Sequence, residues 1–350
     1  MPAKRITAGR ALAKLPAARE RLFRSFRGEV GRTQLVELKG VAPNGNRIFA
    51  KLEYQNPTGS HYDRVYPHLL HLLEQLGVSP KTHVLCETSS GNATVSFAHF
   101  ARRLGYAPLA FMPKELSARR ISPTRKAGAK VFLSRPGSRP FVAGARDRMV
   151  EALEENRRQR AEGRRVKKLF TPNHSQVSET LDAIHSLADE LHSQLARRRV
   201  KPDYFLPVAG NGTIAYGVGK PFHEYFPKAK VIAIEPFERP ALYPLVHSGA
   251  YEGQHGSLPK IDEFAGAEFF MPGSGALGIE FPHLESAAKL VDRVSLVKLG
   301  EWKKAQRQLA ELGFSVGHTS AASFAEAMNL AKRVRNKNIV IIFYDRAERY

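Results

Sequence analysis

The chain has 350 residues, enough for two domains, and its 43% hydrophobic and 25% charged residues are typical of a soluble globular protein. No apolar run approaches the ~18 residues that a membrane-spanning helix needs, so we expect no membrane partner. The net charge of +21 comes without a nucleic-acid-binding motif or interleaved aromatic residues, so we expect a solvated basic surface and no nucleic-acid partner. The single cysteine, Cys86, excludes an internal disulfide and favours a reducing, cytoplasmic location.

The chain opens with a basic arm over residues 1–30, in which apolar residues recur at helical spacing: Leu12, Leu15, Leu22 and Phe26. An extended segment at 48–52 follows and breaks at the turn Asn56-Pro57-Thr58-Gly59. An apolar stripe then predicts a helix. His61 and Tyr62 therefore lie where a strand has just turned into a helix, a common place for functional side chains in α/β proteins.

The remaining elements alternate between strands and helices. Strands are predicted at 82–86, 108–113, 130–133, 204–208, 230–236, 292–297 and 338–344. Helices are predicted at 92–104, 117–126 and 146–168, and from about residues 178, 214 and 317. Residues 238–274 are predicted to be irregular, and 273–281 to form a glycine-rich loop. The alternation predicts an α/β protein with parallel strands and right-handed crossovers.

Two of the predicted strands lead into loops of small residues that open a helix. The first loop is Ser89-Ser90-Gly91-Asn92-Ala93, and the second is Ala209-Gly210-Asn211-Gly212-Thr213. Backbone N–H groups at a helix N-terminus are free to bind an anion, so both loops are candidate ligand sites. A third helix opens around Thr319 and Ser320, which supply hydroxyl groups.

The segment from Lys51 to Arg64 resembles the active-site segment of the fold-type-II pyridoxal-phosphate enzymes, whose pattern is roughly K-x-E-x-x-N-P-T-G-S-x-K-D-R. This family includes cysteine synthase, cystathionine β-synthase and the tryptophan synthase β-chain. The resemblance runs from about residue 31 to residue 350. It implies a two-domain α/β fold with twisted, mostly parallel sheets flanked by helices. By this resemblance the smaller domain covers 47–160, and the larger covers 10–46 plus 161–350.

The resemblance also implies roles for the small-residue loops. The loop at 89–93 would hold the substrate carboxylate, with Asn92 facing the ring oxygen of the cofactor. The loop at 209–213 would cradle the phosphate, although Ala209 and Asn211 replace glycines of the family pattern. Thr319 or Ser320 would face the pyridine nitrogen. The family's imine-forming lysine falls on Tyr62, so Tyr62 and its neighbour His61 are the catalytic candidates.

A phenol cannot form a Schiff base, so the sequence alone leads us to expect a lysine-less, cysteine synthase-like protein. It would bind a phosphate-bearing or amino-acid ligand in the interdomain cleft without imine-based catalysis, as a cofactor-independent enzyme or a pseudoenzyme. We expect no covalent aldimine and no metal, while non-covalent pyridoxal phosphate or another phosphorylated ligand fits. The first alternative is a pyridoxal-phosphate lyase or β-replacement synthase that uses another lysine, such as Lys51 or Lys114. The second is a non-catalytic scaffold with a basic surface, and the family resemblance is compatible with a homodimer.

Overall fold

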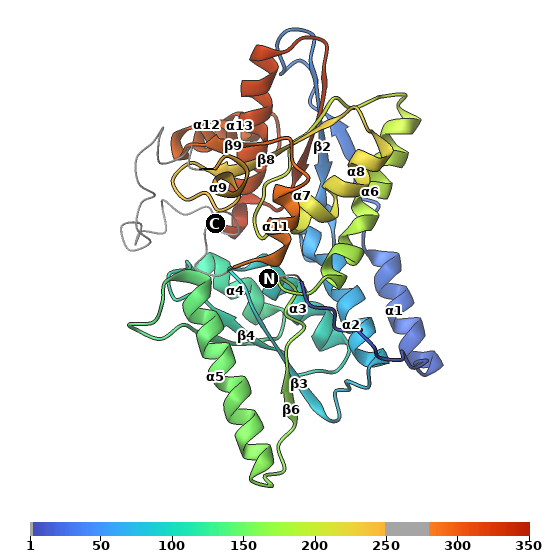
Figure 1. The fold of residues 1–350 in the computed structure, drawn as a ribbon, viewed down its shortest axis with the longest axis vertical. Helices are drawn as coiled ribbons and strands as arrows, with labels where there is room; N and C mark the ends of the chain where they lie inside the picture. The colour runs from blue at the N-terminus through green and yellow to red at the C-terminus, as the bar shows by residue number, and fades with distance from the viewer. Residues whose placement is uncertain (1–2, 249–279) are drawn as a thin grey trace.

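The computed structural model describes residues 3–248 and 280–350, which form two lobes, each built on its own sheet (Figure 1). The six-stranded sheet runs in the order β1 (Leu35–Glu37), β2 (Arg47–Leu52), β10 (Asn338–Phe343), β7 (Tyr204–Phe205), β8 (Lys230–Pro236) and β9 (Arg293–Val297). The four-stranded sheet runs in the order β5 (Lys130–Leu133), β4 (Leu109–Met112), β3 (His83–Thr88) and β6 (Lys168–Phe170). All pairs are parallel except β1 with β2, which confirms the predicted α/β class.

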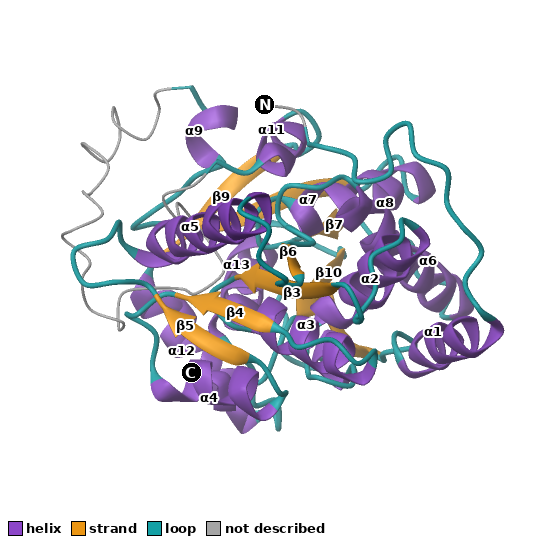
Figure 2. Cartoon of the chain, turned by 90° about the horizontal axis from the view of Figure 1, so that it is seen from below, coloured by secondary structure: helices purple, strands orange, loops and turns teal. Residues whose placement is uncertain are grey.

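Helices cover both faces of both sheets. They are α1 (Ala17–Glu29), α2 (Val65–Gln75), α3 (Asn92–Arg103), α4 (Ala118–Lys126), α5 (Phe141–Ala161), α6 (Glu179–Arg197), α7 (Thr213–Gly217), α8 (Gly219–Tyr225), α9 (Tyr243–Val246), α11 (Pro282–Ala288), α12 (Leu299–Glu311) and α13 (His318–Arg333). In the smaller lobe, α5 packs on one face of the sheet and α3 and α4 on the other (Figure 2). Short 3-10 helices cover Glu53–Gln55, His61–Arg64 and Ala347–Arg349. None of the helices in the described part is both long and apolar enough to cross a membrane.

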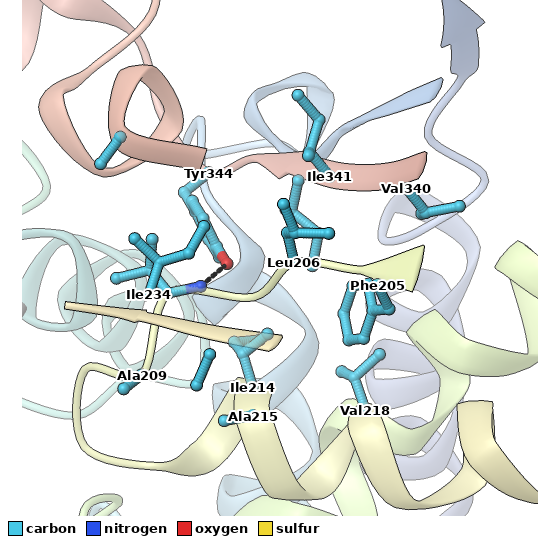
Figure 3. Close-up of a cluster of buried hydrophobic side chains, with 14 of the residues drawn as sticks. Phe205, Leu206, Ala209, Ile214, Ala215, Val218, Ile234, Val340, Ile341 and Tyr344 are labelled. Carbon is cyan, nitrogen blue, oxygen red and sulfur yellow. Dashed lines mark hydrogen bonds between the residues drawn. The ribbon is translucent and has the colours of Figure 1, made fainter. Parts of the chain in front are cut away.

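The core of the larger lobe lies around β10. Residues Ile339 to Phe343 are fully buried, as expected for a central parallel strand that is covered by helices on both faces. They pack with apolar residues of β7, β8 and α7 (Figure 3). In the smaller lobe, α1 inserts Phe23 and Phe26 against Phe100 of α3, so the helical spacing of the N-terminal arm is confirmed there. Leu12 precedes the helix and is exposed.

Two predicted elements are wrong in their extent. The helix predicted at 146–168 begins at Phe141 and ends at Ala161, and β6 occupies residues 168–170. The strand predicted at 204–208 ends at Phe205. Pro207 has no N–H to donate to a neighbouring strand, and the N–H of Val208 donates to the Tyr344 hydroxyl instead, at 2.8 Å (Figure 3).

The strand pairing can be compared with the smaller domain that we predicted at residues 47–160. Strand β2 begins at Arg47 but pairs with β1 and β10 in the six-stranded sheet, while β6, at 168–170, pairs with β3 in the four-stranded sheet. The predicted domain boundaries therefore stay a prediction. The loop predicted at 273–281 lies mostly outside the described residues.

Candidate functional site

One pocket lies where loops from both lobes meet, beyond the carboxyl ends of β3 and β7, the usual place for ligands in α/β sheets. Its lining includes nine of the predicted site residues: His61, Tyr62, Ser89, Ser90, Asn92, Ala209, Gly210, Asn211 and Thr319. Five residues of the lining were not predicted: Arg120, Val208, Ile214, Tyr344 and Tyr350. Gly91, Ala93, Gly212, Thr213 and Ser320 belong to the same loops but are not part of this lining. The structure thus brings together four predicted segments that are far apart in the sequence: 61–62, 89–92, 209–211 and Thr319.

The loop between β3 and α3 depends on a glycine. Gly91 has φ +146°, and a Cβ there would lie 3.0 Å from the guanidinium of Arg120. The Arg120 Nε donates to the Ser90 carbonyl at 3.2 Å, so the arginine packs directly on the loop. The opening of α3 therefore lies beside a buried cation, an arrangement suited to a carboxylate ligand.

Asn92 is oriented by a buried carboxylate. Its Nδ2 donates to Oδ2 of Asp345 at 2.6 Å, and the Tyr350 hydroxyl donates to the same oxygen at 2.8 Å. Arg120 lies 3.6 Å from it. Burial raises the pKa of Asp345 despite these favourable contacts. Oδ1 of Asp345 has no hydrogen-bond partner among the described residues.

The loop between β7 and α7 has glycines at both left-handed positions. Gly210 has φ +52° and Gly212 has φ +88°, whereas Asn211 is not left-handed. Asn211 instead accepts a hydrogen bond from the N–H of Thr213 at 3.1 Å. The replacement of a glycine by Asn211 is therefore compatible with the loop shape. The Thr213 hydroxyl is buried and lacks, among the described residues, the hydrogen-bond partner that buried polar groups normally have.

His61 and Tyr62 both line the pocket, and their rings lie 4.2 Å apart. Burial, together with the Glu87 carboxylate, raises the pKa of Tyr62 to about 12, so the phenol stays protonated at neutral pH. Burial lowers the pKa of His61 to about 4, and its Nδ1 has no partner among the described residues. Tyr62 can therefore donate a hydrogen bond, and His61 is neutral.

The two hydroxyls predicted for the third helix have different environments. Thr319 lines the pocket. Ser320 is fully buried, and its Oγ accepts the N–H of Tyr344 at 2.8 Å, which fixes the end of β10 against α13. Thr319 is therefore the hydroxyl that is available to a ligand.

Lys51 and Lys114, the two lysines considered in place of the family's imine-forming lysine, do not line the pocket. The Nζ of Lys51 is fully buried and lies 2.8 Å from Glu190 and 2.6 Å from the Thr33 carbonyl. Burial lowers the pKa of Lys51. The Nζ of Lys114 donates to the Arg135 carbonyl at 3.2 Å. Among the described residues, no lysine appears in the pocket lining.

Comparison with known proteins decides the family. The sequence matches the family described as "Pyridoxal-phosphate dependent enzyme" over residues 26–345. The chain belongs to this family. It is 28% identical over 328 residues to a cysteine synthase of Staphylococcus aureus, covering 92% of this chain and 93% of the relative. It is 27% identical over 325 residues to cysteine synthase B of Campylobacter jejuni, covering 92% and 94%.

The solved structures show the same fold. A hydrogen sulfide-producing enzyme from Fusobacterium nucleatum matches with a TM-score of 0.76 and 24% identity, covering 93% of this chain and 98% of the other. An O-acetylserine-dependent cystathionine β-synthase from Helicobacter pylori matches with a TM-score of 0.74 and 23% identity, covering 93% and 96%. These likenesses confirm the two-lobed, mostly parallel α/β fold.

The comparisons overturn two predictions. We expected a protein without imine-based catalysis and without a covalent cofactor, but the family is described as pyridoxal-phosphate dependent and its relatives here are cysteine synthases. The alternative of a pyridoxal-phosphate lyase or synthase fits these relatives better. The prediction was wrong because it inferred the chemistry of the whole pocket from one residue, Tyr62.

Proposed function

We propose that the chain is a pyridoxal-phosphate-dependent enzyme that replaces or eliminates a group on the β-carbon of an amino acid. The observation that carries this proposal is the single pocket in which the loops at 89–92 and 209–211 meet Thr319. The names of the relatives point to the substrate class, because cysteine, cystathionine and O-acetylserine all carry sulfur or oxygen on the β-carbon. A serine derivative with a good leaving group is therefore the expected substrate.

The binding residues fit the cofactor's phosphate and ring. The buried, unpartnered hydroxyl of Thr213 and the glycine loop before it would hold the phosphate. Thr319 would face the ring nitrogen, and the Asn92 amide, oriented by Asp345, would lie beside the ring oxygen. When bound, the cofactor supplies an electron-withdrawing ring that stabilises negative charge at the substrate α-carbon.

The chain's own residues would orient the amino acid. The N–H groups that open α3, with Ser89 and Ser90, would bind its carboxylate, and the buried Arg120 adds positive charge behind them. The protonated Tyr62 would donate a hydrogen bond into the same space. These contacts fix the substrate relative to the ring, which is a large part of what an enzyme contributes to such a reaction.

We also propose that Tyr62 stands at the position of the family's lysine, so the amine that bonds the cofactor belongs to another lysine. The protein is loaded with pyridoxal phosphate, reduced with borohydride and mapped by mass spectrometry. A stoichiometric adduct on one lysine identifies that amine. In Tyr62→Lys, the adduct is expected to move to residue 62. If the Tyr62→Lys variant binds the cofactor but keeps its adduct elsewhere, Tyr62 does not stand at the lysine position.

The activity test supplies O-acetylserine and sulfide to the cofactor-loaded protein and measures cysteine. Thr213→Val keeps the size of the side chain and removes only the hydroxyl, so it should weaken cofactor binding about tenfold, as expected for one lost hydrogen bond. Thr82 is exposed and lies outside the pocket lining, so Thr82→Val, which makes the same change of side chain, is the matched control. A wild-type protein that neither binds the cofactor nor forms cysteine would overturn the proposed function.

A further inference from the structure

A carboxylate, an imidazole and a phenol form a buried cluster behind the pocket, outside the residues assigned above. Nδ1 of His174 lies 3.2 Å from Oε2 of Glu87 and 3.0 Å from the hydroxyl of Tyr66. The backbone N–H of His174 donates to the same Glu87 oxygen at 3.2 Å, and the hydroxyl of Thr180 donates to the His174 carbonyl at 2.6 Å. Glu87, Tyr66 and His174 are all buried. The imidazole is therefore held from both its ring and its backbone.

These contacts favour one tautomer of His174. Nδ1 lies 3.2 Å from a Glu87 oxygen that only accepts hydrogen bonds, so a proton on Nδ1 faces an acceptor, whereas a bare Nδ1 would set two lone pairs against each other. Burial and the Glu87 carboxylate raise the pKa of Tyr66, so its phenol keeps its proton and can donate to the same carboxylate. The Nε2 of His174 is then the unprotonated nitrogen, and no hydrogen bond among the described residues engages it.

His174 also reaches the active-site region. It lines a small cavity with Thr88, Ser175 and Phe281. This cavity shares Tyr62, Ser89, Ser90 and Asn211 with the main pocket. The rings of Tyr62 and His174 are perpendicular to each other, with their centroids 5.3 Å apart. The hydroxyl of Thr88 is buried there without a partner among the described residues, so the cavity is partly polar.

We propose that Glu87 and His174 form a dyad in which Nε2 of His174 takes the proton of the incoming thiol. The step rests on the proposed β-replacement function, with the thiol entering the adjoining cavity. The sulfur–carbon bond forms at the β-carbon as the S–H proton passes to Nε2, and the proton then leaves to solvent. The β-carbon–oxygen bond of the serine derivative breaks, and its leaving group departs as a carboxylate. No oxidant or reductant is needed.

His61 is the competing base, and its surroundings argue against it. No carboxylate hydrogen-bonds its ring among the described residues, so nothing selects one tautomer. Burial lowers the pKa of His61 to about 4, which makes it a weak acceptor for a thiol proton. His174 has a carboxylate beside its Nδ1 and lines the cavity.

The test compares two thiols in the cofactor-loaded His174→Gln variant. An alkyl thiol is mostly protonated at pH 7 and needs a base, whereas an acidic aryl thiol is already a thiolate. With the alkyl thiol, kcat/KM should fall about 100-fold or more, the usual contribution of a general base. With the aryl thiol it should change little, which also shows that the variant is folded. His185→Gln is the matched control, because His185 forms an exposed pair with Asp189 at 3.5 Å.

A second measurement needs no cofactor and no variant. Nitrogen-15 NMR of the histidine rings should show His174 as the Nδ1–H tautomer, and an Nε2–H tautomer would overturn the proposal. Equal losses with both thiols in His174→Gln, or no loss with either, would also overturn it while the proposed function stands. If the wild-type protein makes no product from either thiol, the proposed function fails and the proton-transfer step fails with it.

Discussion

Gly212 offers a sharp test of how the second loop is built, because two separate strains meet there. Its φ is +88°, a conformation that disfavours any residue with a Cβ. A Cβ would lie 2.6 Å from the carbonyl oxygen of His283 and 2.6 Å from the nitrogen of Leu284, and closer still to the carbonyl carbon of His283. All three atoms belong to the backbone of α11, so no side-chain rotation can relieve the clash.

The magnitude for Gly212→Ala follows from these two strains. The left-handed conformation costs about 1–2 kcal/mol for a residue with a Cβ. Forcing a methyl group against packed backbone costs about 1–3 kcal/mol more. Gly313→Ala isolates the first strain, because Gly313 has φ +84° and no heavy atom within 4 Å of an added Cβ. The difference between the two variants therefore reports the contact with α11.

Urea unfolding, followed by circular dichroism, measures the free energy of unfolding of both variants. Gly212→Ala should lose about 2–5 kcal/mol and Gly313→Ala about 1–2 kcal/mol. Cofactor binding should weaken in Gly212→Ala alone, because only that loop is proposed to hold the phosphate. Equal losses of stability in the two variants would refute the reasoning, because the close approach of the loop to α11 would then carry no cost.

Three further predictions concern a buried pair, a buried acid and the phosphate loop. Lys51→Met should cost about 1–3 kcal/mol of unfolding free energy, because it removes the hydrogen bonds of the buried ammonium to Glu190 and to the Thr33 carbonyl, while Arg64 still pairs with Glu190; no loss in urea unfolding would contradict this. Burial raises the pKa of Glu235 to about 7 from 4.5, so its stabilising contribution is full below pH 4.5 and is lost as the pH rises through 7. The stability of the wild type relative to Glu235→Gln should therefore fall between pH 4.5 and pH 8, and a constant difference would contradict the buried-acid explanation. Inorganic phosphate should raise the Tm of the wild type more than that of Thr213→Val, as differential scanning fluorimetry can show; equal rises would place the anion elsewhere.

The sequence predicts the larger elements well because their apolar patterns are long. Strand β8 is predicted at its observed limits, and β10 to within one residue, because each contains a run of consecutive buried apolar residues, 231–234 in β8 and 339–343 in β10. Strand β6 is missed because it has three residues at the edge of a sheet and follows a run of basic residues. A hydrophobic pattern can be recognised only when it extends over several helical turns or several alternating strand residues, and β6 is too short for this.

Part of the candidate site can likewise be predicted from the sequence, and part of it cannot. The small-residue loops at 89–93 and 209–213 can be recognised from local sequence, because glycines and helix starts are local features. Arg120, Glu87 and His174 could not be found, because each acquires its role from partners far away in the sequence. The only local signal was the position of Glu87 at the end of a strand, directly before the first loop.

The segment that suggested the family serves two different purposes in the structure. Its charged residues build the scaffold: Glu53 pairs with Arg64 at 2.8 Å, and both Arg64 and Lys51 reach Glu190 of α6. These contacts tie β2 and the following turn to the larger lobe, and they lie outside the pocket lining. Tyr62 lies in the same segment but faces the pocket and makes none of these ion pairs. A motif match therefore reports mainly the scaffold, and a change at residue 62 can alter the chemistry while the ionic network keeps the fold.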